Sequence, residues 1–97
     1  EFLPFNLVLS DMAPNISGIK DRDDAFMIGL VEKVLYIVDT LLAPNGSAII
    51  KVFQGESLDY TVSALKIRFN RVKVFKPKAS RVNSSETYII GKERKLK

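Results

Sequence analysis

Two kinds of apolar spacing alternate along this chain, and the alternation restricts its fold more than any other feature. Residues 5–9 (FNLVL) and 47–53 (SAIIKVF) are nearly continuous apolar runs, typical of strands that are covered on both faces. Between them, from Met27 to Leu42, apolar residues recur three or four positions apart, which predicts a helix with one apolar face. The chain is therefore expected to begin with a strand, a helix and a second strand.

The second half of the chain continues this pattern. Residues 43–46 (APNG) are expected to end the first helix and turn the chain. A second helix is expected to be capped by Ser57 and to carry an apolar face that runs through Phe69. Residues 71–75 (RVKVF) alternate, as in a strand nearer an edge, and residues 87–90 are expected to form a short final strand.

Charged residues mark the ends of several of these elements. Asp21, Asp23 and Asp24 are expected to supply the cap and the first-turn acids of the first helix. Residues 76–85 are expected to form a basic, serine-rich loop, and the residues after Gly91 a frayed basic end.

The order strand–helix–strand–helix–strand–strand predicts an α/β fold with a parallel sheet and right-handed crossovers. The loop before the last strand is too short for a helical crossover, so this strand should run antiparallel to the others. The first strand looks buried on both faces although only one helix follows it, so we expect a strand-and-helix half in front of residue 1. The alternative is a self-contained small α/β domain, which could dimerise to cover the bare edge.

Composition restricts the chemistry. The 97 residues suffice for one small domain or a piece of a larger one. Cysteine and histidine are both absent, which excludes a disulfide scaffold, a cysteine-ligated zinc site and a histidine base. No apolar run approaches the roughly 18 residues of a membrane span, so no membrane partner is expected, and a reducing cytosol or an organelle matrix fits best.

Charge is divided unevenly along the chain. Residues 1–65 hold four Lys/Arg and nine Asp/Glu, whereas residues 66–97 hold eleven Lys/Arg and two Asp/Glu. The balances of −5 and +9 suggest a polyanionic partner for the second segment, with phosphate as the obvious group. On charge alone, a solvated basic tail is an equally good interpretation.

Three charged residues are expected at one edge of the sheet, because ligands of open parallel sheets bind beyond the carboxyl ends of the strands. Asp11 ends the first strand, Lys51 lies in the later half of the second, and Glu86 opens the antiparallel last strand. Taken singly, they could be a turn acid, a lysine that extends to water and a surface acid. Lys51 is the hardest to dismiss, because a lysine within AIIKVF must be paired to offset its desolvation. Burial lowers its pKa and neighbouring carboxylates raise it, and the sequence leaves this balance open.

Three motifs add a specific resemblance. The segments LSDMAPNISG (residues 9–18), IIKVFQGE (residues 49–56) and KPKASRVNSSETY (residues 76–88) closely resemble the FtsJ/RrmJ (RlmE) family of ribosomal RNA 2′-O-methyltransferases. The resemblance covers essentially the whole chain in order. It implies a Rossmann-like methyltransferase fold with an antiparallel final hairpin.

The resemblance also implies a Lys-Asp-Lys-Glu tetrad. The aspartate of the SDMAPN motif corresponds to Asp11, the lysine of the KVFQG motif to Lys51 and the glutamate of the SRxxSxE motif to Glu86. The first lysine of the tetrad, the glycine-rich cofactor loop and the acid that holds the cofactor ribose have no counterpart here. Residues 1–97 are therefore expected to be the C-terminal catalytic part of a single methyltransferase domain that lacks its N-terminal cofactor-binding half.

The implied reaction is methyl transfer from S-adenosylmethionine to a ribose 2′-hydroxyl, most typically of a uridine in large-subunit rRNA. Lys51 is expected to be the base, or the cation that stabilises the developing alkoxide. Asp11 is expected near the methyl donor, where it orients Lys51, and Glu86 is expected to complete the charge network and help place the ribose.

RNA is the implied partner, on the large ribosomal subunit. Lys76, Lys78 and Arg81 lie in the loop that leads to Glu86 and are expected to bind phosphates without specifying sequence, although the loop could also be a solvated basic turn. Other possibilities are a tRNA or messenger-cap substrate for the same chemistry, or a non-catalytic RNA-binding remnant.

Overall fold

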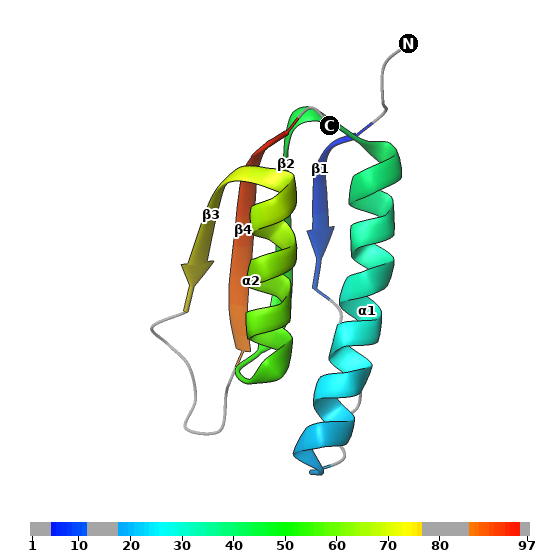
Figure 1. Ribbon diagram of the computed structural model, residues 1–97, viewed down its shortest axis with the longest axis vertical. Coiled ribbons are helices and arrows are strands. Elements are labelled where there is room, and N and C mark those ends of the chain that lie inside the picture. The colour runs from blue at the N-terminus through cyan, green and yellow to red at the C-terminus, as the bar shows by residue number, and fades with distance from the viewer. Residues whose placement is uncertain (1–4, 12–17, 77–85, 96–97) are drawn as a thin grey trace.

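The α/β fold with an antiparallel final strand is confirmed by a computed structural model of the chain, which describes residues 5–11, 18–76 and 86–95 (Figure 1). The elements in chain order are β1 (Phe5–Ser10), α1 (Lys20–Leu41), β2 (Leu42–Phe53), α2 (Glu56–Arg68), β3 (Phe69–Phe75) and β4 (Glu86–Arg94). The sheet has the order β1-β2-β4-β3. β1 runs parallel to β2, and β4 runs antiparallel to both β2 and β3. As predicted, residues 71–75 belong to an edge strand.

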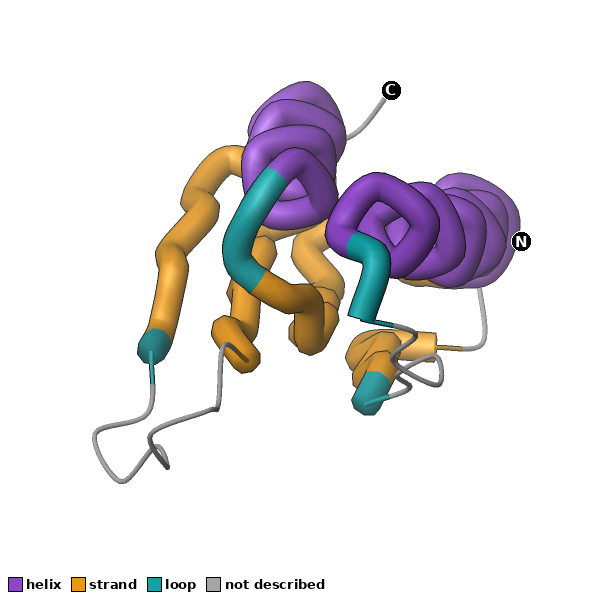
Figure 2. The backbone as a smooth tube through the Cα atoms, turned by 90° about the horizontal axis from the view of Figure 1, so that it is seen from below, coloured by secondary structure: helices purple, strands orange, loops and turns teal. Residues whose placement is uncertain are grey.

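Both helices cover the same face of the sheet (Figure 2). The core lies between the two layers, and its fully buried side chains include Val38 of α1, Ile50 and Val52 of β2, Leu65 of α2 and Ile89 of β4. Burying each such side chain contributes about 1.5–3 kcal/mol. Because side chains of a strand point alternately to opposite faces, the neighbours of these core residues project from the face that the helices leave open.

The predicted turn at residues 43–46 lies inside β2, which begins at Leu42 directly after α1. Here the parallel pairing with β1 is irregular, because Phe5 pairs with Leu42 and Leu7 already with Ser47. Asn45 takes a left-handed φ of 67° at this irregularity. The turn residues therefore distort the start of the strand without separating it from the helix.

The predicted acidic cap of α1 is wrong. The helix begins at Lys20, its capping position is Ile19, and no side chain caps it. The carboxylate of Asp23 instead accepts a hydrogen bond from the Gly18 N–H at 3.3 Å. The expectation of acids in the first turn is confirmed by Asp21 and Asp23, which suit the positive end of the helix dipole.

Ser57 does not cap α2 either. That helix begins at Glu56 after Gly55, whose φ of 130° suits a residue without Cβ. Ser57 is fully buried, and its hydroxyl donates a hydrogen bond to the Phe53 carbonyl at 3.0 Å. The serine therefore joins the helix to β2 from within its first turn.

One expectation for the ends of the sheet needs correction. The final strand extends beyond residues 87–90 to Arg94, which pairs with Phe69, so the basic end is ordered strand up to that residue. β1 is an edge strand, and only α1 packs on it from the helical layer. Among the described residues nothing covers its other face, where Leu7 and Leu9 are 54% and 62% exposed.

Candidate active site

The three charged residues predicted for one rim come from three strand ends. Asp11 directly follows β1, whose last residue, Ser10, pairs with Ile50 of β2. Glu86, the first residue of β4, pairs with Phe53, two residues beyond Lys51. This rim is the lower edge of the sheet in Figure 1, where the β1 and β3 arrows end and β4 begins.

Lys51 lies between two carboxylates. Its Nζ is 3.1 Å from Asp11 Oδ1 and 3.6 Å from Glu86 Oε2. The lysine side chain is only 12% exposed, whereas those of Asp11 and Glu86 are 63% and 42% exposed. Lys51 alternates with the core residues Ile50 and Val52, so it projects from the face opposite the helices. The two carboxylates pair with the shielded ammonium group of Lys51, and each carboxylate is still partly exposed to solvent.

Tyr88 is a fourth member of the cluster that the sequence did not single out. It pairs across the sheet with Lys51, and its hydroxyl donates a hydrogen bond to Asp11 Oδ1 at 3.4 Å. A signal was available, because Tyr88 shares the face of Glu86 two residues earlier on the same strand.

The pKa of Lys51 is raised above its ordinary value. Burial, the largest influence, lowers the pKa, but the hydrogen bond to Asp11 and the charges of Glu86, Asp11 and Tyr88 together outweigh it. Lys51 is therefore an ammonium ion at neutral pH. This decides the balance that the sequence left open, and the cluster can present a fixed positive charge to an oxygen that gains negative charge.

The predicted phosphate-binding loop is only partly visible. Lys76 is exposed just after β3, whereas Lys78 and Arg81 lie outside the described residues. Within the described ranges, no group of acidic residues is arranged to hold a metal ion. In that same part of the chain, neither helix is long and apolar enough to cross a membrane.

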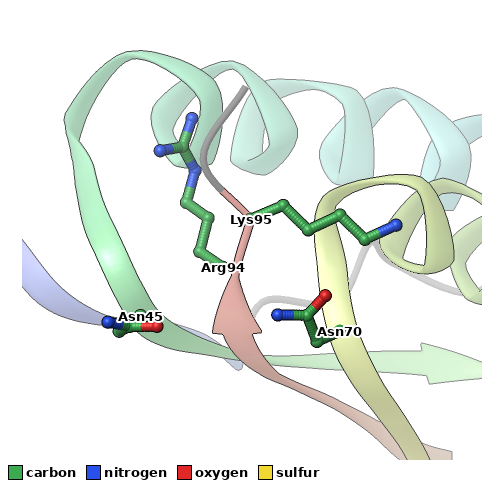
Figure 3. A pocket seen from close by; sticks show the side chains of 4 residues that line it. All are labelled: Asn45, Asn70, Arg94 and Lys95. Carbon is green, nitrogen blue, oxygen red and sulfur yellow. The ribbon is translucent and has the colours of Figure 1, made fainter.

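A second recess of about 350 Å³ lies at the opposite edge of the sheet, lined by Asn45, Asn70, Arg94 and Lys95 (Figure 3). Arg94 donates a hydrogen bond to the Asp39 carbonyl and Lys95 to the Lys66 carbonyl, each at 3.2 Å. These acceptors lie in the last turns of α1 and α2, whose carbonyls lack helical partners. The two cations therefore complete the helix ends, and we do not include this recess in the candidate site.

A comparison with family models identifies the family of this chain. The profile of FtsJ-like methyltransferases matches residues 2–94. A ribosomal RNA large subunit methyltransferase E from Polaromonas sp. is 45% identical over 87 residues, which cover 90% of this chain and 35% of that protein. A protein of the same name from Methylobacillus flagellatus is 47% identical over 92 residues, covering 95% of this chain and 44% of its own length.

A solved structure from Plasmodium falciparum, described as a ribosomal RNA methyltransferase, superposes with a TM-score of 0.81 at 25% identity. The match covers 95% of this chain and 48% of that one. The chain thus spans less than half of the relatives and of the solved structure that it matches.

Proposed function

Because this chain belongs to the FtsJ-like methyltransferase family, we propose that it carries the catalytic residues for methyl transfer to a ribose 2′-hydroxyl of large-subunit rRNA, most typically of a uridine. The observation that carries the proposal is the shielded ammonium of Lys51 between the carboxylates of Asp11 and Glu86. These residues lie within the segment that matches the family, at the sheet edge where open α/β folds bind ligands.

The methyl donor in this proposal is S-adenosylmethionine, which supplies a methyl group already activated on a positively charged sulfur. Asp11 fits such a group, because its carboxylate stays 63% exposed while it contacts Lys51 and Tyr88. A partly free carboxylate favours a cation beside it. The relatives are more than twice as long as their matched regions, which supports treating residues 1–97 as the C-terminal part of one larger methyltransferase domain.

Lys51 has two conceivable roles, and its raised pKa supports one of them. To act as a base, Lys51 would first have to lose its own proton, which Asp11 and Glu86 disfavour. As a cation, it can donate a hydrogen bond to the 2′-oxygen and stabilise the negative charge that develops there as the oxygen takes up the methyl group and its proton passes to water at the exposed rim. Glu86 holds the ammonium from its other side, and its exposed carboxylate oxygen is available to the ribose.

Two observations support RNA as the substrate. The curated relatives are named for methylation of large-subunit ribosomal RNA. Residues 66–97, which begin in the last turn of α2 and contain Glu86, carry the charge balance of +9. A cationic segment that contains part of the site would bring the phosphate backbone to it.

The test is radiolabelled methyl transfer to large ribosomal subunits by the full-length gene product. We expect Lys51→Ala to lower the rate by about 100-fold or more, the usual loss when such a stabilising group is removed. Lys33→Ala removes an exposed lysine of α1 instead and should keep the rate. Full activity of Lys51→Ala would rule out the role given to this lysine. Methyl transfer to tRNA or to a messenger cap, and not to rRNA, would show that the substrate proposed here is wrong. Binding of RNA without affinity for S-adenosylmethionine would favour a non-catalytic RNA-binding remnant.

A further inference from the structure

The helices leave one face of the sheet open (Figure 2), and the side chains on this face differ between its two halves. On β1 and β2 it presents Leu7, Leu9 and Ile49, which are aligned by the parallel pairing of the two strands. Toward the other edge, β3 and β4 present the cations Arg71, Lys73 and Lys92 around Ile90. Burying this second half against an apolar partner would require several charges to lose their water. The second half therefore suits a polar, negatively charged partner.

The cations of β3 and β4 lie side by side. Arg71 pairs with Lys92, and Lys73 pairs with Ile90 in the next position on the same face. These four residues line a shallow recess of about 50 Å³. Arg71, Lys73 and Lys92 are all exposed. We call these three cations the basic face.

The basic face is only partly neutralised. Arg71 forms an ion pair with Glu93 at 2.8 Å, with 64% of the arginine side chain still exposed. Among the described residues, no carboxylate lies within ion-pair distance of Lys73 or Lys92. Lysines on an edge strand such as β3 also discourage pairing with other chains, but that reason does not explain Lys92, which lies on the interior strand β4.

The basic face continues into the candidate active site. Two residues beyond Lys73, Phe75 pairs with Tyr88, which in turn pairs with Lys51. At about 3.4 Å per residue, Lys73 lies about 7 Å along the strand from Phe75, and Arg71 about 14 Å. Phe75 is 55% exposed at the junction, as an aromatic side chain must be to stack on a base.

We propose that the basic face binds phosphates of the substrate RNA beside the target nucleotide, with Phe75 stacking on a base between them and the active site. This inference rests on the proposed function, because it takes RNA to be the substrate. The residues of the basic face position the RNA and take no part in the chemistry, so their loss weakens RNA binding and leaves the transfer step intact.

The test compares two double variants of the full-length gene product that remove the same charge. Lys73→Gln/Lys92→Gln neutralises the basic face, and Lys33→Gln/Lys66→Gln neutralises two exposed lysines of the helical layer. Binding of a fluorescent single-stranded oligoribonucleotide is measured over a range of salt concentrations. The slope of log K against log salt is negative, and each lost phosphate contact reduces its magnitude by about 0.7, so we expect the first variant to have a slope shallower by about 1.4. The control should keep the wild-type slope.

Equal slopes for the two double variants would overturn the inference. A methyl-transfer assay separates this failure from that of the proposed function. If the inference holds, Lys73→Gln/Lys92→Gln raises KM for rRNA and keeps kcat. If wild type transfers methyl groups and the variant keeps both constants, the proposed function stands and the basic face is only a solvated surface. If wild type transfers none, the proposed function fails whatever the binding slopes show.

Discussion

Lys51 is a shielded lysine that keeps its charge. Only 12% of its side chain is exposed, and this burial on its own would lower the pKa of the lysine. The carboxylates of Asp11 and Glu86 reverse this shift, and both reach Lys51 from the ends of neighbouring strands. The charge of the candidate site is therefore a property of three strand ends and depends on each of them.

Asp11→Asn should lower the pKa of Lys51, because the hydrogen bond to Asp11 is the largest influence that raises it. A lysine whose folded pKa exceeds its unfolded value stabilises the fold below the unfolded pKa, and this contribution is lost as pH rises through the folded pKa. Asp11→Asn should therefore make this contribution smaller and complete its loss at a lower alkaline pH. NMR titration of the lysine side chain measures the pKa, with Asp59→Asn in α2 as the control. An unchanged pKa in Asp11→Asn would show that the ion pair does not hold the charge.

At the scale of elements, Gly91 and Gly29 allow a matched test of how closely the strands and helices pack. A Cβ at Gly91 of β4 would lie 2.7 Å from the ring of Phe69, whereas a Cβ at Gly29 of α1 would have no atom within 4 Å. We expect Gly91→Ala to lower the free energy of unfolding by about 1–3 kcal/mol, because the buried ring must shift. Gly29→Ala should raise it by about 1 kcal/mol through helix propensity.

Urea denaturation of both variants measures the two changes. Similar effects of the two substitutions would mean that the β3–β4 contact is looser than the structure indicates. A stabilised Gly91→Ala would contradict the close packing of Phe69 against β4 outright.

The spacing of apolar residues predicted well which segments form helices and strands. The residue types at the ends of these segments predicted poorly where the helices and strands begin and end. The helix periods and apolar runs indicated the right elements because each element packs one face against the core between the helices and the sheet. The residues of 43–46 have turn chemistry, yet Leu42 before them is fully buried, so the chain enters the sheet before it bends. Ser57 is a good capping residue, yet its hydroxyl points inward to the Phe53 carbonyl. At both positions, packing against the core determines the local structure, and the neighbouring residues in the sequence do not indicate this packing.

The convergence of Asp11, Lys51 and Glu86 was predictable for a related reason. Topology alone fixes which strand ends share a rim, and the sequence indicated the topology. The contact of Tyr88 with Asp11 and the sign of the Lys51 pKa shift depend on distances of a few ångströms. Such distances follow from strand register and twist, which the sequence pattern does not specify.

At the scale of the whole molecule, β1 presents both a free strand edge and an apolar face, which together favour association. We expect the 97-residue chain on its own to self-associate, and Leu7→Lys/Leu9→Lys to reduce this association. Tyr36→Lys/Ile67→Lys replaces two exposed side chains of the helices and is the control. Analytical ultracentrifugation over a range of concentrations measures the effect. An equal response of both variants would mean that added charge alone, and not the face of β1, governs association.

The position of β4 has a consequence for synthesis. This strand follows β1, β2 and β3 in the sequence, yet it lies between β2 and β3 and pairs with both. While the ribosome is still adding residues 86–94, β3 has no neighbour and Lys51 has only one of its two carboxylates. Closure of the sheet and delivery of Glu86 to Lys51 are therefore a single late event, so a nascent chain cannot close its sheet without also pairing that lysine.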